Sequence, residues 1–315
     1  MKKRLILIIP LLIVIVVCFI PVTSQRAVLV KATFFNTFQQ LAQADNWPKW
    51  RPDLRETWLS DPSKISTSGK KQNFSINQGS LSLSVANIDG YSFNVQEKNS
   101  TSILDYQYTV VPQNPPNHTQ VIVTEKKSAF RYIIDKLGKG NNLSETHIDD
   151  FKHFMETPDL YYGFPIRKIK VPDTCMIGLT KTVLAKDKYT EAKAMLNALK
   201  QFAASNHLQQ TNPFIGQYIQ GQGDSVRLKI GLPVNRQVKP ALPFLLMTMP
   251  SGDHWNTILF NGKFTDRKKA YSALYQYYHD TGQQLILLPF DTFLDNKLPD
   301  SDSSKIRLRV NFSAY

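Results

Sequence analysis

The sequence of 315 residues predicts an α+β protein in which an N-terminal membrane helix precedes two folded domains. Three observations carry this prediction: an uncharged apolar run after MKKR, a long stretch of period-two alternation, and an order of strand, helix, strand, strand that occurs twice. Apolar residues make up 42% and charged residues 20%, which excludes a disordered chain. The predicted parts are residues 1–24, 25–167 and 168–315.

The first predicted element is a transmembrane helix. Residues 5–22 form a run of 18 residues without a charge, which is close to the length that spans a bilayer. The basic residues 2–4 precede it, and the positive-inside rule predicts that they stay in the cytoplasm. We therefore expect a single-pass cell-membrane protein with the bulk of the chain extracytoplasmic, on the periplasmic side. A signal peptide cleaved after Ser24 is the alternative.

The first domain is predicted to be a meander flanked by helices. RAVLVKAT, from Arg26, predicts a strand, and the apolar residues that follow have helical spacing; they are Phe34, Phe35, Phe38 and Leu41. Three of the four tryptophans come next, at positions 47, 50 and 58. Residues 72–126 alternate apolar and polar side chains in five segments, which predicts an antiparallel meander. A helix over residues 142–162, with Ser144 as its N-cap, closes the domain.

The second domain is predicted to contain two copies of one unit. The first copy has a strand at 176–183, a helix at 190–207 and strands at 214–219 and 226–234. The second copy has strands around 244–250 and at 255–262, a helix at 265–279 and strands at 285–293 and 305–312. Two copies that share one sheet are sufficient to bury both helices.

The charge distribution limits the partners. From Lys168 onward there are 19 basic and 11 acidic side chains, which is +8 of the total formal charge of +13 and disfavours a strongly cationic partner at long range. No run of Lys and Arg exceeds three residues and no zinc-finger or helix-turn-helix spacing is present, so we predict no nucleic-acid partner. Two cysteines exclude a disulfide framework and a four-cysteine zinc site. We expect no cofactor and no metal.

The histidines do not predict a catalytic or metal site. His147 and His153 are six positions apart, which places them about 240° apart around a helix and makes a shared metal implausible. We expect both on a solvated helix face, together with the neighbouring acidic side chains. No G-x-S-x-G motif is present, and no catalytic residue is assigned.

Two family resemblances follow from these segments. RAVLVKAT, the aromatic helix, NWPKW and the closing DDFKHFMETPDLYYGF resemble the START-like superfamily, also called SRPBCC or polyketide-cyclase-like, over residues 25–164. Residues 171–315 resemble the GyrI-like effector-binding domain, and the tandem behind a membrane anchor resembles a class of bacterial SRPBCC/GyrI-like proteins. The resemblance implies that the START-like domain holds an apolar molecule between sheet and helix. It implies that the GyrI-like domain holds a lipophilic, often cationic, molecule between its halves.

The second resemblance also implies a ligand site. GyrI-like domains carry a Pro-aromatic-Glu-x-Tyr motif, and residues 289–293 match it, with Asp291 in place of the Glu and Phe293 in place of the Tyr. The expected aromatic wall consists of Tyr218, Trp255, Tyr271, Tyr275, Phe290 and Phe293. Rings and a buried carboxylate favour a cation, but the +8 excess opposes one, so a cationic, neutral or anionic ligand stays open. An exposed Asp291 at a strand end is the alternative.

The expected function is non-enzymatic. We predict membrane-anchored binding or sensing of a lipophilic small molecule by the two domains. The alternative is an enzyme, cyclase-like or hydrolase-like, that acts on a hydrophobic small molecule, because the resemblance includes families with such activities. Those activities require a positioned acid, base or activated water, and no such cluster is evident in the sequence.

Overall fold

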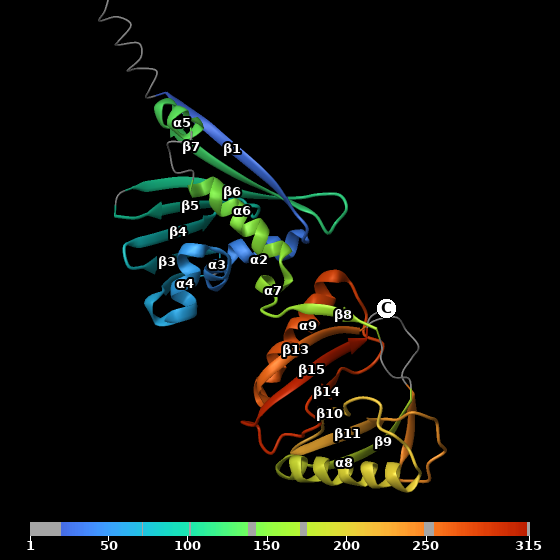
Figure 1. Ribbon diagram of the computed structural model, residues 1–315. Coiled ribbons are helices and arrows are strands. Elements are labelled where there is room, and N and C mark those ends of the chain that lie inside the picture. The colour runs from blue at the N-terminus through green and yellow to red at the C-terminus, as the bar shows by residue number, and fades with distance from the viewer. Residues whose placement is uncertain are drawn as a thin grey trace, which may run out of the picture. The chain divides into compact units, whose positions relative to one another are not determined.

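A computed structural model of the chain describes residues 20–70, 72–100, 102–137, 143–170, 175–248 and 255–313. It confirms the mixed α+β class and contains two antiparallel sheets (Figure 1). The chain divides between Tyr161 and Tyr162 into two compact units, called unit 1 and unit 2 below. The boundary predicted between Arg167 and Lys168 falls inside strand β8 (Ile166–Ile169), which belongs to the second sheet.

Most of the predicted membrane segment, residues 5–19, lies outside the described residues. Its predicted last two residues, Pro21 and Val22, belong instead to strand β1 (Pro21–Val30), where they pair with Ser128 and Lys127. Among the helices in the described ranges, none combines the length and the apolar character that a bilayer crossing requires.

Unit 1 is built on a seven-stranded antiparallel sheet with the order β1-β7-β6-β5-β4-β3-β2. Besides β1, its strands are β2 (Ser66–Lys70), β3 (Asn73–Gln78), β4 (Leu81–Asn87), β5 (Ser92–Lys98), β6 (Ile103–Pro112) and β7 (Thr119–Ser128). Strands β3 to β7 are neighbours in sequence and in the sheet, which confirms the predicted meander. Because side chains alternate across a strand, every second residue of β6 is buried over most of its length.

The helices of unit 1 are α2 (Phe34–Ala42), α3 (Trp47–Trp50), α4 (Pro52–Ser60), α5 (Ala129–Lys136), α6 (Leu143–Glu156) and α7 (Pro158–Tyr161). Helix α2 begins where the Thr33 hydroxyl oxygen accepts a hydrogen bond from the Asn36 amide. The helix predicted over 142–162 is interrupted before α7, because Pro158 has no amide donor and restricts the residue before it. The predicted N-cap Ser144 lies within α6.

Aromatic rings fill the space between the unit 1 sheet and helix α6, which packs against β1 and β7 (Figure 1). Trp47 and Trp50 are buried, with their ring centroids 4.9 Å apart. Trp50 also contacts Phe151 of α6, edge to face at 5.1 Å, and Tyr108 of β6. Such edge-to-face contacts stabilise an aromatic core beyond the effect of area burial.

Unit 2 is built on an eight-stranded antiparallel sheet with the order β12-β9-β11-β10-β14-β15-β13-β8. One copy of the repeat consists of β9 (Cys175–Leu184), α8 (Lys188–Ser205), β10 (Ile215–Gln220) and β11 (Ser225–Pro233). The other consists of β13 (Trp255–Lys263), α9 (Lys268–Thr281), β14 (Phe290–Phe293) and β15 (Lys305–Ser313). The predicted duplication is therefore confirmed, and the pairing of β10 with β14 joins the copies.

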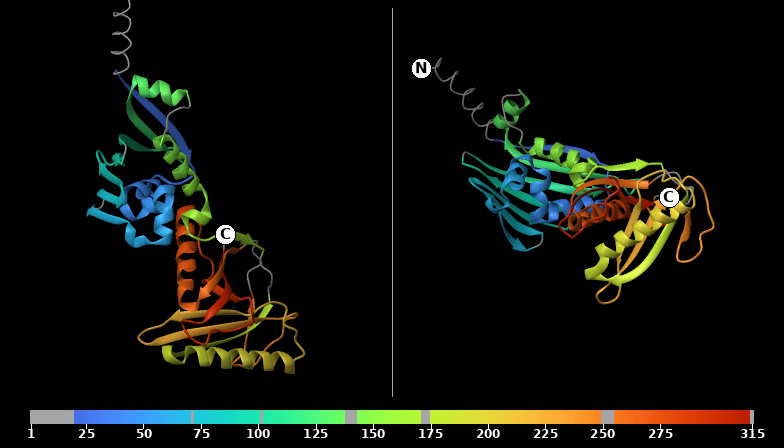
Figure 2. Two further views of the ribbon diagram at one scale, coloured as in Figure 1. Left: turned by 60° about the vertical axis from the view of Figure 1, so that its left-hand side comes forward. Right: turned by 60° about the horizontal axis from the view of Figure 1, so that its bottom comes forward.

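Helices α8 and α9 pack on one face of the unit 2 sheet (Figure 2) and bury the main core against it. The opposite face is called the open face below. The strand β12 (Leu245–Thr248), predicted at the start of the second copy, pairs with β9 of the first. The strand predicted over 285–293 is reduced to β14, because Pro289 cannot donate to a neighbouring strand.

Candidate functional site

The open face of unit 2 is hollowed by two adjoining cavities of about 660 and about 380 Å³, which share Met176 and Ile215 as lining residues. Together they are called the groove. Met176, Ile215, Phe290 and Trp255 form a small buried apolar cluster at this face, separate from the main core. The larger cavity is lined mainly by apolar side chains, and it also includes Thr180, Gln217, Arg227 and Lys229.

One wall of the groove is the extended segment before β14. Gln217 Nε2 of β10 donates hydrogen bonds to the carbonyl oxygens of Leu288 and Pro289, both at 3.0 Å. The amides of residues 286 and 287 donate to the Ser313 hydroxyl oxygen at 3.1 and 2.9 Å. These bonds hold the segment beside the sheet, although it is not itself a strand. Its Leu288 side chain is 64% exposed.

The other wall is the edge strand β12. Its Leu245 and Leu246 side chains line the larger cavity and are 39% and 38% exposed. The Met247 side chain packs over two glycines of strands β9 and β11. A Cβ atom at Gly178 would collide with the Met247 Sδ atom, and a Cβ atom at Gly231 would approach the Met247 Cε atom. The absence of side chains at Gly178 and Gly231 therefore allows β12 to place apolar atoms over the sheet.

Asp291 lies on the helix-covered face and is completely buried, so it is not the exposed strand-end residue of the alternative prediction. Its Oδ2 accepts a hydrogen bond from Arg267 Nε at 3.1 Å, and its Oδ1 accepts one from the Tyr271 hydroxyl at 2.8 Å. Burial raises the pKa of Asp291 above its ordinary value, although Arg267 and Tyr271 act in the opposite direction.

Arg267 is the cation that Asp291 binds in this structure. Its guanidinium carbon lies 3.6 Å from the Phe264 ring centroid and 5.6 Å from that of Tyr218. A cationic ligand would have to displace this guanidinium to reach the carboxylate. Arg267 therefore already supplies the positive charge that the rings and the carboxylate were predicted to attract from a ligand.

The structure brings only some of the predicted wall residues together. Tyr218, Tyr271 and Phe293 lie on the helix-covered face with Asp291. Tyr275 of α9 is 49% exposed and packs edge to face on Phe312 at 4.8 Å. Trp255 and Phe290 lie on the open face instead, with ring centroids 4.9 Å apart. Because successive side chains of a strand point to opposite faces, Phe290 and Asp291 cannot line one cavity.

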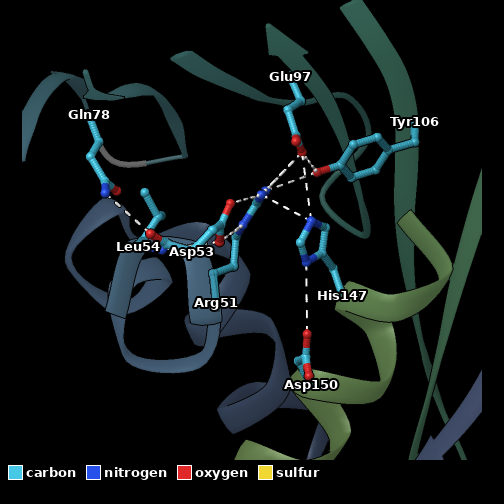
Figure 3. Close-up of polar contacts among 8 residues, drawn as sticks. All are labelled: Arg51, Asp53, Leu54, Gln78, Glu97, Tyr106, His147 and Asp150. Atoms are coloured by element: carbon cyan, nitrogen blue, oxygen red, sulfur yellow. Dashed lines mark hydrogen bonds and ion pairs between the residues drawn. The ribbon is translucent and has the colours of Figure 1, made fainter. Parts of the chain in front are cut away.

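A second candidate site is a buried ionic cluster in unit 1, centred on Arg51, whose side chain is 0% exposed (Figure 3). Its guanidinium makes a two-pronged contact with Asp53, Nε to Oδ1 at 3.0 Å and Nη2 to Oδ2 at 2.6 Å. Nη1 and Nη2 both donate to Glu97 Oε2 at 3.2 Å. The Tyr106 hydroxyl also donates to Glu97 Oε2, at 3.1 Å. The cluster links α4, β5, β6 and the segment after α3.

His147 of α6 completes this cluster, which corrects the prediction that it lies on a solvated face. It is 6% exposed, and its Nε2 is 3.1 Å from Arg51 Nη2. Burial, and secondarily the charge of Arg51, lowers the pKa of His147 to about 4. The imidazole is therefore neutral at pH 7, with Nε2 as the acceptor of the Arg51 hydrogen bond. His153, by contrast, is exposed as predicted.

The cluster includes three metal-ligand side chains. One ligand atom from each of Asp53, Glu97 and His147 lies within 4.8 Å of the others. Arg51 Nη2 contacts all three residues, however, so the guanidinium already supplies the positive charge that these groups require. A metal ion would have to displace a completely buried arginine. The arrangement is therefore that of an internal ion-pair network.

Comparisons with known proteins were made on the whole chain. No protein-family model and no curated protein sequence matches it. Among solved structures, it is similar to the EcmrR C-terminal domain, at 16% identity over 48% of this chain and 98% of that chain, with a TM-score of 0.40. EcmrR in complex with DNA gives 13% identity over 60% of this chain and 77% of that chain, also at a TM-score of 0.40.

A START superfamily protein from Mycobacterium smegmatis is similar at 12% identity, over 42% of this chain and 97% of that chain, with a TM-score of 0.30. Similarities at this level assign no family to the chain.

Proposed function

We propose that unit 2 binds a lipophilic small molecule in the groove on its open face. The observation that carries this proposal is the larger of the two groove cavities, of about 660 Å³. Its volume suits a small ligand, and leucine side chains are exposed on its walls. Exposed apolar side chains gathered around one cavity are typical of a binding site. The duplicated order of strands and helices supports a GyrI-like assignment for unit 2.

For unit 1 we propose a START-like fold whose interior is occupied by its own side chains. The rings of Trp47, Trp50, Tyr108 and Phe151 lie between sheet and helix, where a ligand of such a fold would sit. The proposal therefore assigns ligand binding to unit 2 and a supporting role to unit 1. It assigns no catalytic residue in either unit.

Replacing Leu288 by aspartate is expected to weaken binding of an apolar dye such as Nile red about tenfold, because it removes apolar contact area and places a charge in the groove wall. The measurement is a fluorescence titration of the full chain. Leu184→Asp is the matched control, since Leu184 is also exposed, at 49%, and lies outside the groove lining. Equal dye affinity in both variants would contradict the assignment of the groove.

We also propose that the apolar segment before β1 is retained as a single membrane span, with both units extracytoplasmic. The uncharged run and the preceding basic residues 2–4 support this proposal. A reporter enzyme fused at the carboxyl end should be active only outside the cytoplasm, and the chain should fractionate with membranes. Recovery in the soluble fraction with a new amino terminus near Gln25 would show a cleaved signal instead.

A further inference from the structure

The groove contains basic side chains whose positions follow from strand register. In β11, Leu228 and Ile230 belong to the main core, so the alternate residues Arg227 and Lys229 point to the open face. Both line the larger cavity. Within the described part of the chain, neither residue forms an ion pair with a carboxylate. Two basic side chains thus lie beside an apolar floor, and no described carboxylate is paired with either of them.

The smaller cavity repeats this combination of basic and apolar side chains. Lys170 and Arg309 are among its lining residues, next to Trp255 and Leu294. Of the described residues that line either cavity, none is an aspartate or a glutamate. The described lining of the groove therefore carries a net positive charge, in the same sense as the excess of its domain.

Neutral polar groups lie next to the cations of the larger cavity. Lys229 is paired in the sheet with Thr180 of β9 on one side and with Gln217 of β10 on the other. Both neighbours line the cavity as well. A hydroxyl and an ammonium group on adjacent strands suit a small anionic head group, such as a carboxylate or a phosphate.

We propose that the ligand of the groove is an amphiphile with one anionic head group and an apolar tail, and this inference rests on the proposed function. The head group lies against Arg227 and Lys229, and the tail lies along the floor of Met176, Ile215 and Phe290. A cationic ligand is disfavoured here, because the buried Asp291 is on the other face and is already bound by Arg267.

The test compares ligands that share a ten-carbon chain and differ in charge: decanoate, decyl phosphate, decanol and decyltrimethylammonium. Each is titrated into the full-length protein by calorimetry, below its critical micelle concentration. Decanoate or decyl phosphate should bind about tenfold to hundredfold more tightly than decanol, the effect expected of a charge-assisted hydrogen bond. Their affinity, unlike that of decanol, should fall as ionic strength rises. The ratio of the dissociation constants of decanoate and decyl phosphate distinguishes a carboxylate ligand from a phosphate ligand.

Variants assign the effect to the two cations. The double variant Arg227→Glu/Lys229→Glu should remove the preference for anions, whereas Arg227→Lys/Lys229→Arg should retain it. The matched control is Lys200→Glu/Lys268→Glu, which makes the same charge change at exposed positions of α8 and α9. Thermal unfolding of each variant verifies that it is folded.

The outcomes separate this inference from the proposed function. Binding of decanol or decyltrimethylammonium as tightly as decanoate would overturn the anionic assignment and leave the groove as a binding site. An unchanged preference for anions in the folded Arg227→Glu/Lys229→Glu variant would also overturn it. Absence of binding by all four probes would contradict the proposed function itself.

Discussion

Replacing Arg51 by methionine is expected to lower the free energy of unfolding of unit 1 by about 3–5 kcal/mol, the range for breaking a buried ion pair by removing one partner. The variant leaves Glu97, 4% exposed, without its cation and leaves His147 Nε2 without its donor. Unfavourable burial of an unpaired carboxylate then destabilises the folded state. Urea unfolding followed by tryptophan fluorescence measures the change, because three of the four tryptophans lie in unit 1.

Arg26→Met is the matched control for this variant. Arg26 also forms an ion pair, with Asp149 at 2.5 Å, but the two side chains are 40% and 49% exposed. Because this pair is exposed, we expect Arg26→Met to lower the free energy of unfolding by less than about 1 kcal/mol. A second variant, Arg51→Met/Glu97→Gln, should recover part of the lost stability, because it removes the unpaired charge. Equal effects of Arg51→Met and Arg26→Met would show that the buried cluster does not stabilise the unit.

Lowering the pH from 7 to 4 is expected to remove up to about 3 kcal/mol of stability from unit 1 through His147 alone. The pKa of His147 is about 4 in the folded protein, below the value of 6.5 for a solvated histidine. The unfolded chain therefore binds the proton more tightly. The stabilising contribution is complete above pH 6.5 and is lost as the pH falls toward 4, because protonation places a second cation against Arg51.

Burial, and secondarily the charge of Arg51, set the sign of this effect against the carboxylates near His147. Glu97 Oε2 lies 4.0 Å from His147 Nε2, and Asp150 Oδ2 lies 3.9 Å from Nδ1. The charges of Asp53 and Glu97 raise the pKa of His147 and so favour the imidazolium, but burial and the charge of Arg51 outweigh them. His147→Gln keeps an acceptor for Arg51 without a titrating group, so its unfolding free energy should vary less between pH 6.5 and 4. His153→Gln, at an exposed position, should keep the wild-type profile; identical profiles for wild type and His147→Gln would refute this role.

Part of the buried cluster could have been predicted from spacing alone. His147 precedes Phe151 and Phe154 by four and seven positions, which places it on the same apolar face of a helix. Glu97 likewise continues the period-two series of buried Phe93 and Val95 in β5. A polar residue at an inward-facing position predicts a buried partner. The partner, Arg51, carries no such signal, because it follows α3 in an irregular segment.

The groove could not be predicted from the sequence in the same way. Arg227 and Lys229 alternate with core residues, a pattern that also describes any strand with one solvated face. The match of residues 289–293 to a motif predicts one site that contains both Phe290 and Asp291, but strand alternation places these two side chains on opposite faces. Burial of the carboxylate and its pairing with Arg267, 24 residues earlier in the chain, depend on the packing of α9 against the sheet.

The sequence by itself determined the α+β class, the meander of unit 1 and the duplicated order of unit 2, because the period of hydrophobic side chains is a local property of each segment. Only the tertiary structure decided that β12 pairs with β9, that Arg51 meets Glu97, and that Arg227 and Lys229 lie beside an apolar floor. These contacts join residues far apart in sequence. Which residues meet is decided by the pairing of strands and by the requirement that buried charges be compensated. The local period of hydrophobic side chains contains no information on either.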